Sequence, residues 1–403
     1  MNDLVKQLEP LLEDDELAKS LLVLPDFKSN LKSKGEKLLA LNEVYKIFIP
    51  NKTTAEIYNR LYLSVVNSLE KKNTLCETQL LNDNYRTIKG LSRYGVIGGL
   101  DSYRLTGPAG IGKTSTIQRC IDLISNNKII KSSRPYREII PILEVETVSD
   151  CSIKSLLYSI LIKIDEKLGT NFYISNSSQR ITIDLLLAAV SNALTNHVAL
   201  LCVDEIERIV ENKKGIVLLN YLTQLINQSN VSICFIGTEE ANKFFEIKEY
   251  LARRMLGTSL KKMEFDDNFA YFCDCLFKYQ YTDEKCKLNS EIIRWLYNHS
   301  NGVPSMVVSL FVESQKNALI NNLNSLDIKT FQKTFDSLFS TMSIYVDFKE
   351  TKHKTVTYKS EIELPSNEHK ELKDIFSIVS KVAYKDLEKA VAILKENITV
   401  EYV

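Results

Sequence analysis

The chain has 403 residues, and its 51 lysine and arginine residues are balanced by 51 aspartate and glutamate residues, so the formal net charge is zero. This balance excludes a protein coated in positive charge, and any nucleic-acid binding must come from a local basic track or from an oligomer that aligns weak sites. No apolar run is long enough to cross a bilayer, and the acidic N-terminus is unlike a signal peptide. With eight scattered cysteines, these features indicate a cytoplasmic protein of two or three domains with no membrane partner.

Residues 1–95 are expected to form a helical extension ahead of the main domain. Apolar residues recur at helical spacing from Thr53 to Leu69. Four lysines between residues 28 and 37 form a short basic run, which is either a solvated surface or a contact with DNA or an acidic partner. The glycine-rich stretch Gly90–Gly99 either covers an adenine base or is a plain linker turn. Its candidate base-contacting residues are Tyr94, Val96 and Ile97.

A short strand from Tyr103 to Thr106 leads into a phosphate-binding loop with the pattern G-x-x-x-x-G-K-[ST], and a helix follows the loop. Glycines let the loop curl so that its N–H groups approach a phosphate chain, and the start of the helix adds positive potential. Lys113 is placed to bind the β- and γ-phosphates of ATP, and the Thr114 hydroxyl to bind Mg²⁺. The predicted nucleotide-binding residues are Gly107, Pro108, Ala109, Gly110, Ile111, Gly112, Lys113, Thr114 and Ser115.

Strands and helices then alternate, which predicts an α/β domain over residues 96–264 whose parallel sheet carries helices on both faces. The further predicted strands are Ile142–Glu146, Val198–Val203 and Val231–Gly237. The predicted helices are Ile153–Leu168, Leu185–Leu194 and a segment from about Ile216 to Ile226.

Two adjacent carboxylates follow the most apolar of these strands. Asp204 is placed to hold Mg²⁺, and Glu205 to orient and polarise an attacking water. Asp204 could instead cap a helix. Because both carboxylates stand at the carboxyl end of a buried strand, the catalytic interpretation is favoured, and an intact Glu205 predicts hydrolysis of ATP rather than binding alone.

Two later positions are candidates for nucleotide sensing. Thr238 ends the next strand, where it either senses the γ-phosphate or caps the following helix. Arg253 and Arg254 fit an arginine finger that reaches the nucleotide of a neighbouring subunit, and the alternative is a surface salt bridge.

The last part of the chain divides at about residue 342. Residues 265–342 have helical spacing and predict a small helical lid, in which Asn301–Pro304 ends one helix and starts the next. Residues 343–403 are polar and β-leaning before a last helical stretch, and we expect them to form a partner-binding tail.

Taken together, these residues resemble the AAA+ ATPase regulators of bacterial transposition, the TnsC/TniB family, and are most similar to its TnsC branch. The resemblance spans roughly residues 1–320 and leaves the tail uncovered. The stretches that carry it are GPAGIGKTSTIQR in the phosphate loop, DCSIK at Asp150–Lys154, LGTNFY at Leu168–Tyr173, DEIE at Asp204–Glu207, GTEEA from Gly237, and the pair Arg253–Arg254.

The resemblance implies an AAA+ P-loop core that uses ATP and Mg²⁺, in a ring or filament of identical subunits on double-stranded DNA bound without sequence preference. Such an assembly receives a signal from a target-selector protein, TniQ-like or TnsD-like, and recruits and activates transposase subunits. Lys154 is the candidate DNA contact, because the start of its helix lines the central channel of such assemblies. The alternative is a solvated lysine at the start of a helix.

Two departures from the family pattern stand out. The Gly-x-Pro turn is followed by Ser305–Val308 instead of a sensor arginine, which puts control of hydrolysis by the lid in doubt, and Glu207 stands where an amide is expected. Two other functions stay open. An ATPase similar to replication initiators or helicase loaders would add a winged-helix domain after the lid, and a signalling NTPase of a defence system would add long helical repeats.

Overall fold

The computed structural model describes residues 3–72, 102–133, 136–147, 152–178, 180–210, 221–222, 224–225, 229, 231–242 and 255–339. The chain groups into two compact units. The first, here called the α/β unit, comprises Met1–Leu11 and Glu56–Lys262. The second, here called the helical unit, comprises Leu12–Ala55 and Met263–Val403.

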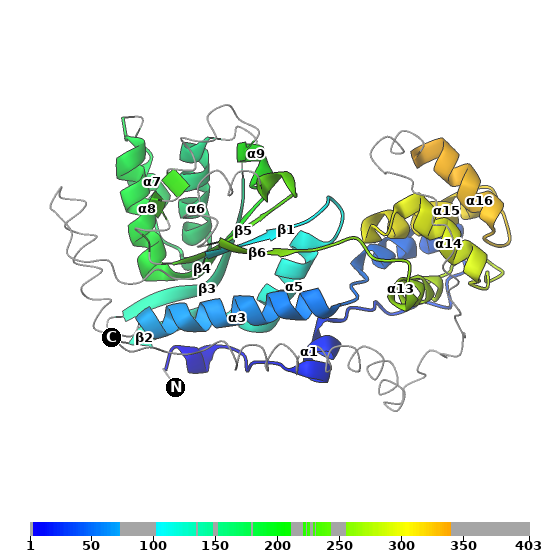
Figure 1. The fold of residues 1–403 in the computed structure, drawn as a ribbon, viewed down its shortest axis with the longest axis horizontal. Coiled ribbons are helices and arrows are strands. Elements are labelled where there is room, and N and C mark those ends of the chain that lie inside the picture. The colour runs from blue at the N-terminus through cyan, green and yellow to red at the C-terminus, as the bar shows by residue number, and fades with distance from the viewer. Residues whose placement is uncertain are drawn as a thin grey trace, which may run out of the picture. The chain divides into compact units, whose positions relative to one another are not determined.

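The α/β unit is built on a six-stranded sheet in the order β2-β3-β4-β5-β1-β6 (Figure 1). Its strands are β1 (Ser102–Thr106), β2 (Ile130–Ser133), β3 (Tyr136–Glu146), β4 (Val198–Asp204), β5 (Ser232–Gly237) and β6 (Met255–Ser259). Neighbouring strands are parallel except for β2 and β3, which are antiparallel. Only two residues separate this pair, and so short a connection turns the chain back on itself. The sheet is therefore mainly parallel, as expected, with one antiparallel pair at this edge.

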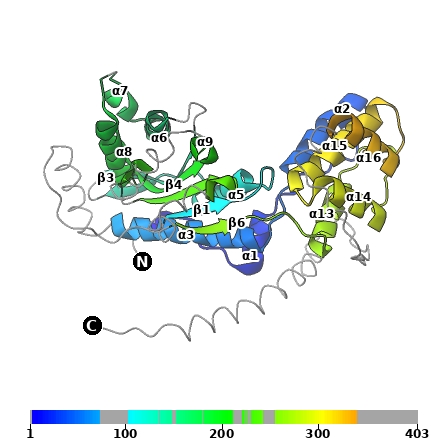
Figure 2. The ribbon, with the colours of Figure 1, turned by 45° about the horizontal axis from the view of Figure 1, so that its top comes forward.

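Helices cover both faces of the sheet, which confirms the predicted α/β class. Figures 1 and 2 show α6 (Ile153–Leu168) and α8 (Ile183–His197) on one face, with the short α7 (Phe172–Asn176) beside them. On the other face lie α3 (Lys52–Lys72) and α5 (Lys113–Ser125). Among the described residues, no helix has the length and apolar character needed to span a membrane.

Strand β4 lies inside the sheet, and every residue from Val198 to Asp204 is buried. A continuous apolar run is what a strand covered on both faces requires. In register, Asp204 lies opposite Glu146 of β3, and Thr106 at the end of β1 lies opposite Gly237 at the end of β5. The carboxyl ends of these parallel strands therefore meet at one edge of the sheet, where the candidate residues gather.

The helical unit combines two parts of the chain that are far apart in sequence. Its elements are α1 (Asp14–Leu21), α2 (Lys34–Ala40), a 3₁₀ helix (Leu41–Lys46), α13 (Asp267–Phe277), α14 (Ser290–Ser300), α15 (Pro304–Ile320), α16 (Ile328–Thr334) and a π turn (Phe335–Phe339). Leu41 and Val44 are fully buried in one apolar cluster with Phe269 and Phe311. The contacts thus divide residues 1–72 between the two units, although the sequence reads as a single N-terminal extension.

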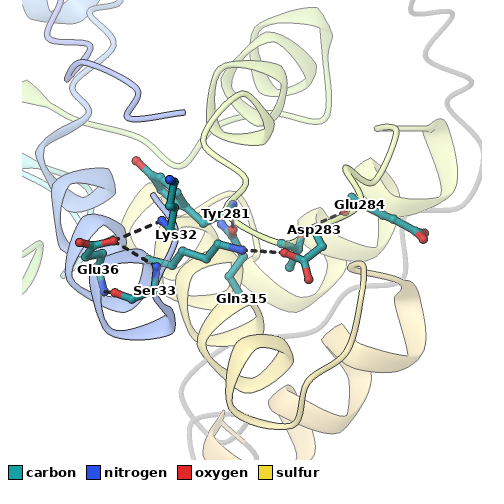
Figure 3. A network of polar contacts seen from close by, with 9 residues as sticks. Lys32, Ser33, Glu36, Tyr281, Asp283, Glu284 and Gln315 are labelled. Atoms are coloured by element: carbon teal, nitrogen blue, oxygen red, sulfur yellow. Dashed lines mark hydrogen bonds and ion pairs between the residues drawn. The ribbon is translucent and has the colours of Figure 1, made fainter. Parts of the chain in front are cut away.

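Polar contacts fasten the N-terminal part to the later helices of this unit (Figure 3). Glu36 accepts a hydrogen bond from the Ser33 N–H (3.1 Å), which completes a capping box at the start of α2. Lys37 forms an ion pair with Asp283 (2.6 Å), and Lys34 Nζ donates to a carbonyl at the end of α15 (2.8 Å). Two of the four lysines in the basic run are therefore engaged within the fold.

The turn between α14 and α15 follows the predicted pattern. Asn301 and Gly302 have φ values of 50° and 70°, and α15 begins at Pro304. A left-handed residue commonly ends a helix, and proline is favoured at the first helical position. Met306 and Val307, at positions where a sensor arginine would be expected, are buried in the core of the helical unit.

Candidate nucleotide-binding site

The phosphate-binding loop joins β1 to α5, and its glycines are needed for two reasons. Gly110 and Gly112 have φ values of 74° and 93°, in the left-handed region that glycine enters without strain. At Gly107 the reason is space, because a Cβ there would lie 2.5 Å from the carbonyl oxygen of Leu260, just after β6. The loop is therefore tightly curled and held closely against the end of β6.

Lys113 is the first residue of α5 and lies in the curve of this loop. Its Nζ donates to the carbonyl oxygens of Gly107 (2.9 Å) and Pro108 (3.0 Å). Gly112, the N-cap, has no side chain to bond the first turn of the helix, so the N–H groups of that turn face the loop. Burial lowers the pKa of Lys113, and nearby carboxylates, led by Glu207, oppose this effect. Together the ammonium and the N–H groups form a site suited to phosphate oxygens.

Thr114 and Asp204 link the start of α5 to the end of β4. The Thr114 hydroxyl donates to Oδ2 of Asp204 (2.7 Å), while Oδ1 of Asp204 accepts from the Glu205 N–H (2.7 Å). Magnesium that is shared with nucleotide phosphates needs only one or two protein oxygens and keeps several waters. The hydroxyl and the buried carboxylate fit that requirement.

Glu205 has a left-handed backbone, with a φ of 58°. This conformation costs a residue other than glycine about 1 to 3 kcal/mol and often occurs at functional sites. Its carboxylate forms an ion pair with Arg208, whose Nη1 donates to the carbonyl oxygen of Thr147 just after β3 (3.0 Å). Thr147 in turn donates from its N–H (3.0 Å) and its hydroxyl (2.8 Å) to the carbonyl oxygen of Asp204. The contacts around Asp204 and Glu205 therefore hold both carboxylates at the end of β4.

Thr238 follows β5, the strand that lies between β4 and β1 in the sheet. Its N–H donates to Oε2 of Glu207 (3.1 Å), and its hydroxyl donates to Oε2 of Glu240 (2.8 Å). Asn242 donates from Nδ2 to the hydroxyl of Thr106 (3.3 Å), which ties this segment to the end of β1. The sheet order thus places Thr238 between the phosphate loop and the two carboxylates.

Lys154 is the second residue of α6 and lies apart from these contacts. Ser152 caps the helix by accepting from the Ser155 N–H (3.0 Å), and Lys154 Nζ lies 5.8 Å from the centroid of the Tyr158 ring. The lysine is half-buried along its own helix. Several other candidates lie outside the described residues: Tyr94, Val96, Ile97, Arg253, Arg254 and most of the expected helix at 216–226.

The sequence marks Glu207 only as a departure from the family pattern and does not single out Arg208, although both contact residues of the site. Both belong to α9 (Glu207–Val210), a single turn after the left-handed residue Glu205. This turn directs Glu207 toward the end of β5 and Arg208 toward the end of β3. For Arg208 the available signal is its spacing of three residues from Glu205, since such pairs meet on a helix surface.

Glu144 of β3 makes the stability of the α/β unit depend on pH. Burial, and then the charge of Asp204, raise the pKa of Glu144 from 4.5 to about 7. Between these values the folded chain keeps a proton that the unfolded chain has lost, so stability falls as pH rises. We expect Glu144→Gln to be more stable than the wild type at pH 8 by about 1 kcal/mol, after allowance for solvent screening, and to differ little near pH 4.5. Urea unfolding without Mg²⁺ measures this, and an equal difference at both pH values would contradict it.

The chain was compared with protein-family models, curated proteins and solved structures. Residues 101–245 match a family model described as an AAA domain, and no curated protein matches the sequence. Among solved structures, the chain is similar to the ORC2 protein of Aeropyrum pernix in ADPNP–ADP complexes, with 14% identity, 66% of this chain and 67% of that chain covered, and a TM-score of 0.41. The chain is also similar to Drosophila ORC bound to DNA, with 12% identity, 85% of this chain and 73% of that chain covered, and a TM-score of 0.45. A third similar structure is domain III of the Thermotoga maritima replication initiation protein DnaA, with 12% identity, 64% of this chain and 91% of that chain covered, and a TM-score of 0.37.

The matched range contains strands β1 to β5 together with the phosphate loop and the Asp204–Glu205 pair. An AAA domain is a nucleotide-binding module that generally hydrolyses ATP. The α/β unit of this chain therefore has the AAA+ ATPase fold.

Proposed function

We propose that this chain is an ATP-dependent DNA-binding regulator of transposition, which assembles on DNA, links a target-site selector to a transposase and is switched by ATP hydrolysis. The observation that carries the ATPase part is the hydrogen bond between Thr114 and Asp204 beside an intact Glu205. The regulatory part is supported by the stretches that resemble the TnsC/TniB family, which lie at Asp150–Lys154, Leu168–Tyr173 and from Gly237 onward.

The residues of the site divide the chemistry between them. Lys113 and the N–H groups of the loop bind the β- and γ-phosphates of ATP. Thr114 and Asp204 would hold Mg²⁺, which would neutralise charge on the phosphate oxygens. Glu205 orients a water and accepts its proton as the water attacks the γ-phosphate, whose bond to the bridging oxygen breaks to release ADP. Thr238 donates a hydrogen bond to the γ-phosphate and so reports whether it is present.

The proposal is tested by imaging the purified protein with duplex DNA and a slowly hydrolysed ATP analogue. We expect rings or filaments of identical subunits on DNA of any sequence, and their disassembly when ATP is hydrolysed. Adding the transposase and a TniQ-like or TnsD-like selector should direct insertion near the assembled protein. Assembly that instead loads a replicative helicase would favour an initiator or loader, and no assembly on DNA would favour a signalling NTPase.

DNA binding is expected to need ATP and to weaken steeply with salt, because each phosphate that a lysine or arginine neutralises releases condensed counterions. Lys154→Ala should weaken binding equally for all sequences and reduce the slope of log affinity against log salt by about one unit, since one cation per subunit is removed from the DNA backbone. The matched control is Lys163→Ala on the same helix, where the lysine is paired with Glu166 (2.9 Å). Fluorescence anisotropy measures both. A base preference that disappears in Lys154→Ala would rule out a backbone contact.

A further inference from the structure

The residue before Thr238 is Gly237. A carboxylate occupies the space where the side chain of any other residue would lie at this position. A Cβ on Gly237 would lie 2.6 Å from Oε2 of Glu207 and 2.8 Å from Cγ2 of Ile206. Gly237 is not among the residues with positive φ, so its backbone conformation does not call for glycine. Glycine is needed here because there is no room for a side chain, and the carboxylate of Glu207 fills the space.

Glu207 and its neighbour hold the end of β5 through two successive bonds. The Ile206 N–H donates to the carbonyl oxygen of Ile236 (3.1 Å), which continues the pairing of β4 and β5 past the end of β4. Oε2 of Glu207 then accepts from the Thr238 N–H (3.1 Å). The backbone of Thr238 is therefore fixed relative to the segment that carries Asp204 and Glu205.

The hydroxyl of Thr238 has a different kind of partner. It donates to Glu240, which is exposed, and a bond to an exposed group adds little net stability because water competes for it. That bond can exchange for one to a phosphate oxygen while the bond to Glu207 keeps the backbone in place. The charge of Glu207 also opposes the lowering of the Lys113 pKa that burial causes.

We propose that Glu207 is a positioning residue for ATP hydrolysis, which holds the backbone of Thr238 so that its hydroxyl faces the γ-phosphate beside the water that Glu205 activates. This inference rests on the proposed ATPase function. Glu207 acts through Thr238 and does not itself contact the nucleotide.

Two conservative variants of Glu207 separate the effect of its side-chain length from the effect of its charge. Glu207→Asp keeps the charge but is one methylene too short to reach the Thr238 N–H, and we expect its kcat to fall about 10-fold with the KM for ATP within about 2-fold of the wild type. Glu207→Gln loses the charge but keeps an acceptor oxygen of the same reach, and its kcat should stay within about 3-fold. A larger loss of kcat in Glu207→Gln than in Glu207→Asp would show that the charge beside Lys113 matters, and would overturn the positioning role.

A double-mutant cycle tests the route through Thr238. Glu207→Ala and Thr238→Ala should each lower kcat by about 10-fold, and the double variant should be no slower than the slower single variant, because both changes remove one interaction. Losses that multiply would overturn the proposal. Glu239→Ala, which removes an exposed carboxylate next to Thr238, is the matched control and should match the wild type. Thermal unfolding of each variant confirms that it is folded, and if Glu207→Ala is not, Glu207→Asp replaces it in the cycle.

Failure of this inference is distinguishable from failure of the proposed function. A wild-type protein that does not hydrolyse ATP under any condition would refute the ATPase function itself. A wild type that hydrolyses ATP, loses hydrolysis in Glu205→Gln and is unaffected by Glu207→Asp would refute only the role of Glu207.

Discussion

Glu205→Gln is expected to bind ATP as tightly as the wild type and to hydrolyse it at least about 100-fold more slowly, within the range of general-base catalysis. The amide has the shape of the carboxylate, but it cannot accept the proton of the attacking water. Binding is measured with a fluorescent ATP analogue and turnover by phosphate release. The change should leave the fold intact, because the ion pair with Arg208 is 42% and 37% exposed on its two sides, and exposed pairs contribute less than about 1 kcal/mol.

Lys113→Ala is the control that separates binding from chemistry. This change removes the cation held by the carbonyls of Gly107 and Pro108, so the affinity for ATP should fall together with turnover. Equal loss of ATP binding in Lys113→Ala and Glu205→Gln would contradict the roles assigned to both residues.

Alanine at the finger position, Arg253 or Arg254, is expected to lower kcat by about 10³-fold while ATP binding by the monomer stays nearly intact. Met255 directly follows the pair and lies opposite Ser102 at the start of β1, whereas the phosphate loop follows Thr106 at its end. At about 3.3 Å per residue, the chain enters β6 roughly 13 Å along the strand direction from its own phosphate loop. This arrangement favours action on the nucleotide of a neighbouring subunit, so the ATPase rate per subunit should rise with protein concentration and with DNA.

Mixing two inactive variants tests action between subunits. Assemblies that contain both Glu205→Gln and the arginine-to-alanine subunits have some interfaces at which an intact Glu205 faces an intact arginine. ATPase activity should therefore partly return on mixing. A mixture that is shown to co-assemble by light scattering and yet stays inactive would exclude an arginine finger at this position.

Local patterns in the sequence were sufficient for the elements that build the site. The helix predicted at Ile153–Leu168 has those bounds in the structure, because apolar residues at helical spacing form its buried face. The phosphate loop lies between β1 and α5, and β4 is fully buried as its apolar run predicts. In each case the information lies within a few neighbouring residues.

The sequence was insufficient where a distant partner decides the structure. The segments IKSS and MLGTS are short and contain polar residues or glycine, and they become the edge strands β2 and β6 only through pairing with β3 and β1. The ion pair of Lys37 with Asp283 joins residues 246 positions apart, which no periodicity can reveal. At the site, the contacts of Glu207 and Arg208 depend on the left-handed turn at Glu205, and nothing in the residue types signals that turn.

The interruption of the helical unit by the α/β unit sets an order of events during synthesis. The segment Leu12–Ala55 is translated before Glu56–Lys262 of the α/β unit, but its partners in the helical unit begin only at Met263, roughly 200 residues later. At a translation rate of about 5 to 20 residues per second, Leu41 and Val44 stay unburied for on the order of 10 to 40 seconds, until the aromatic residues that cover them have been synthesised. During that interval the intervening α/β unit can fold independently. Leu12–Ala55 is therefore translated before most of the α/β unit and packed after it, and its apolar residues stay uncovered on the nascent chain in the meantime.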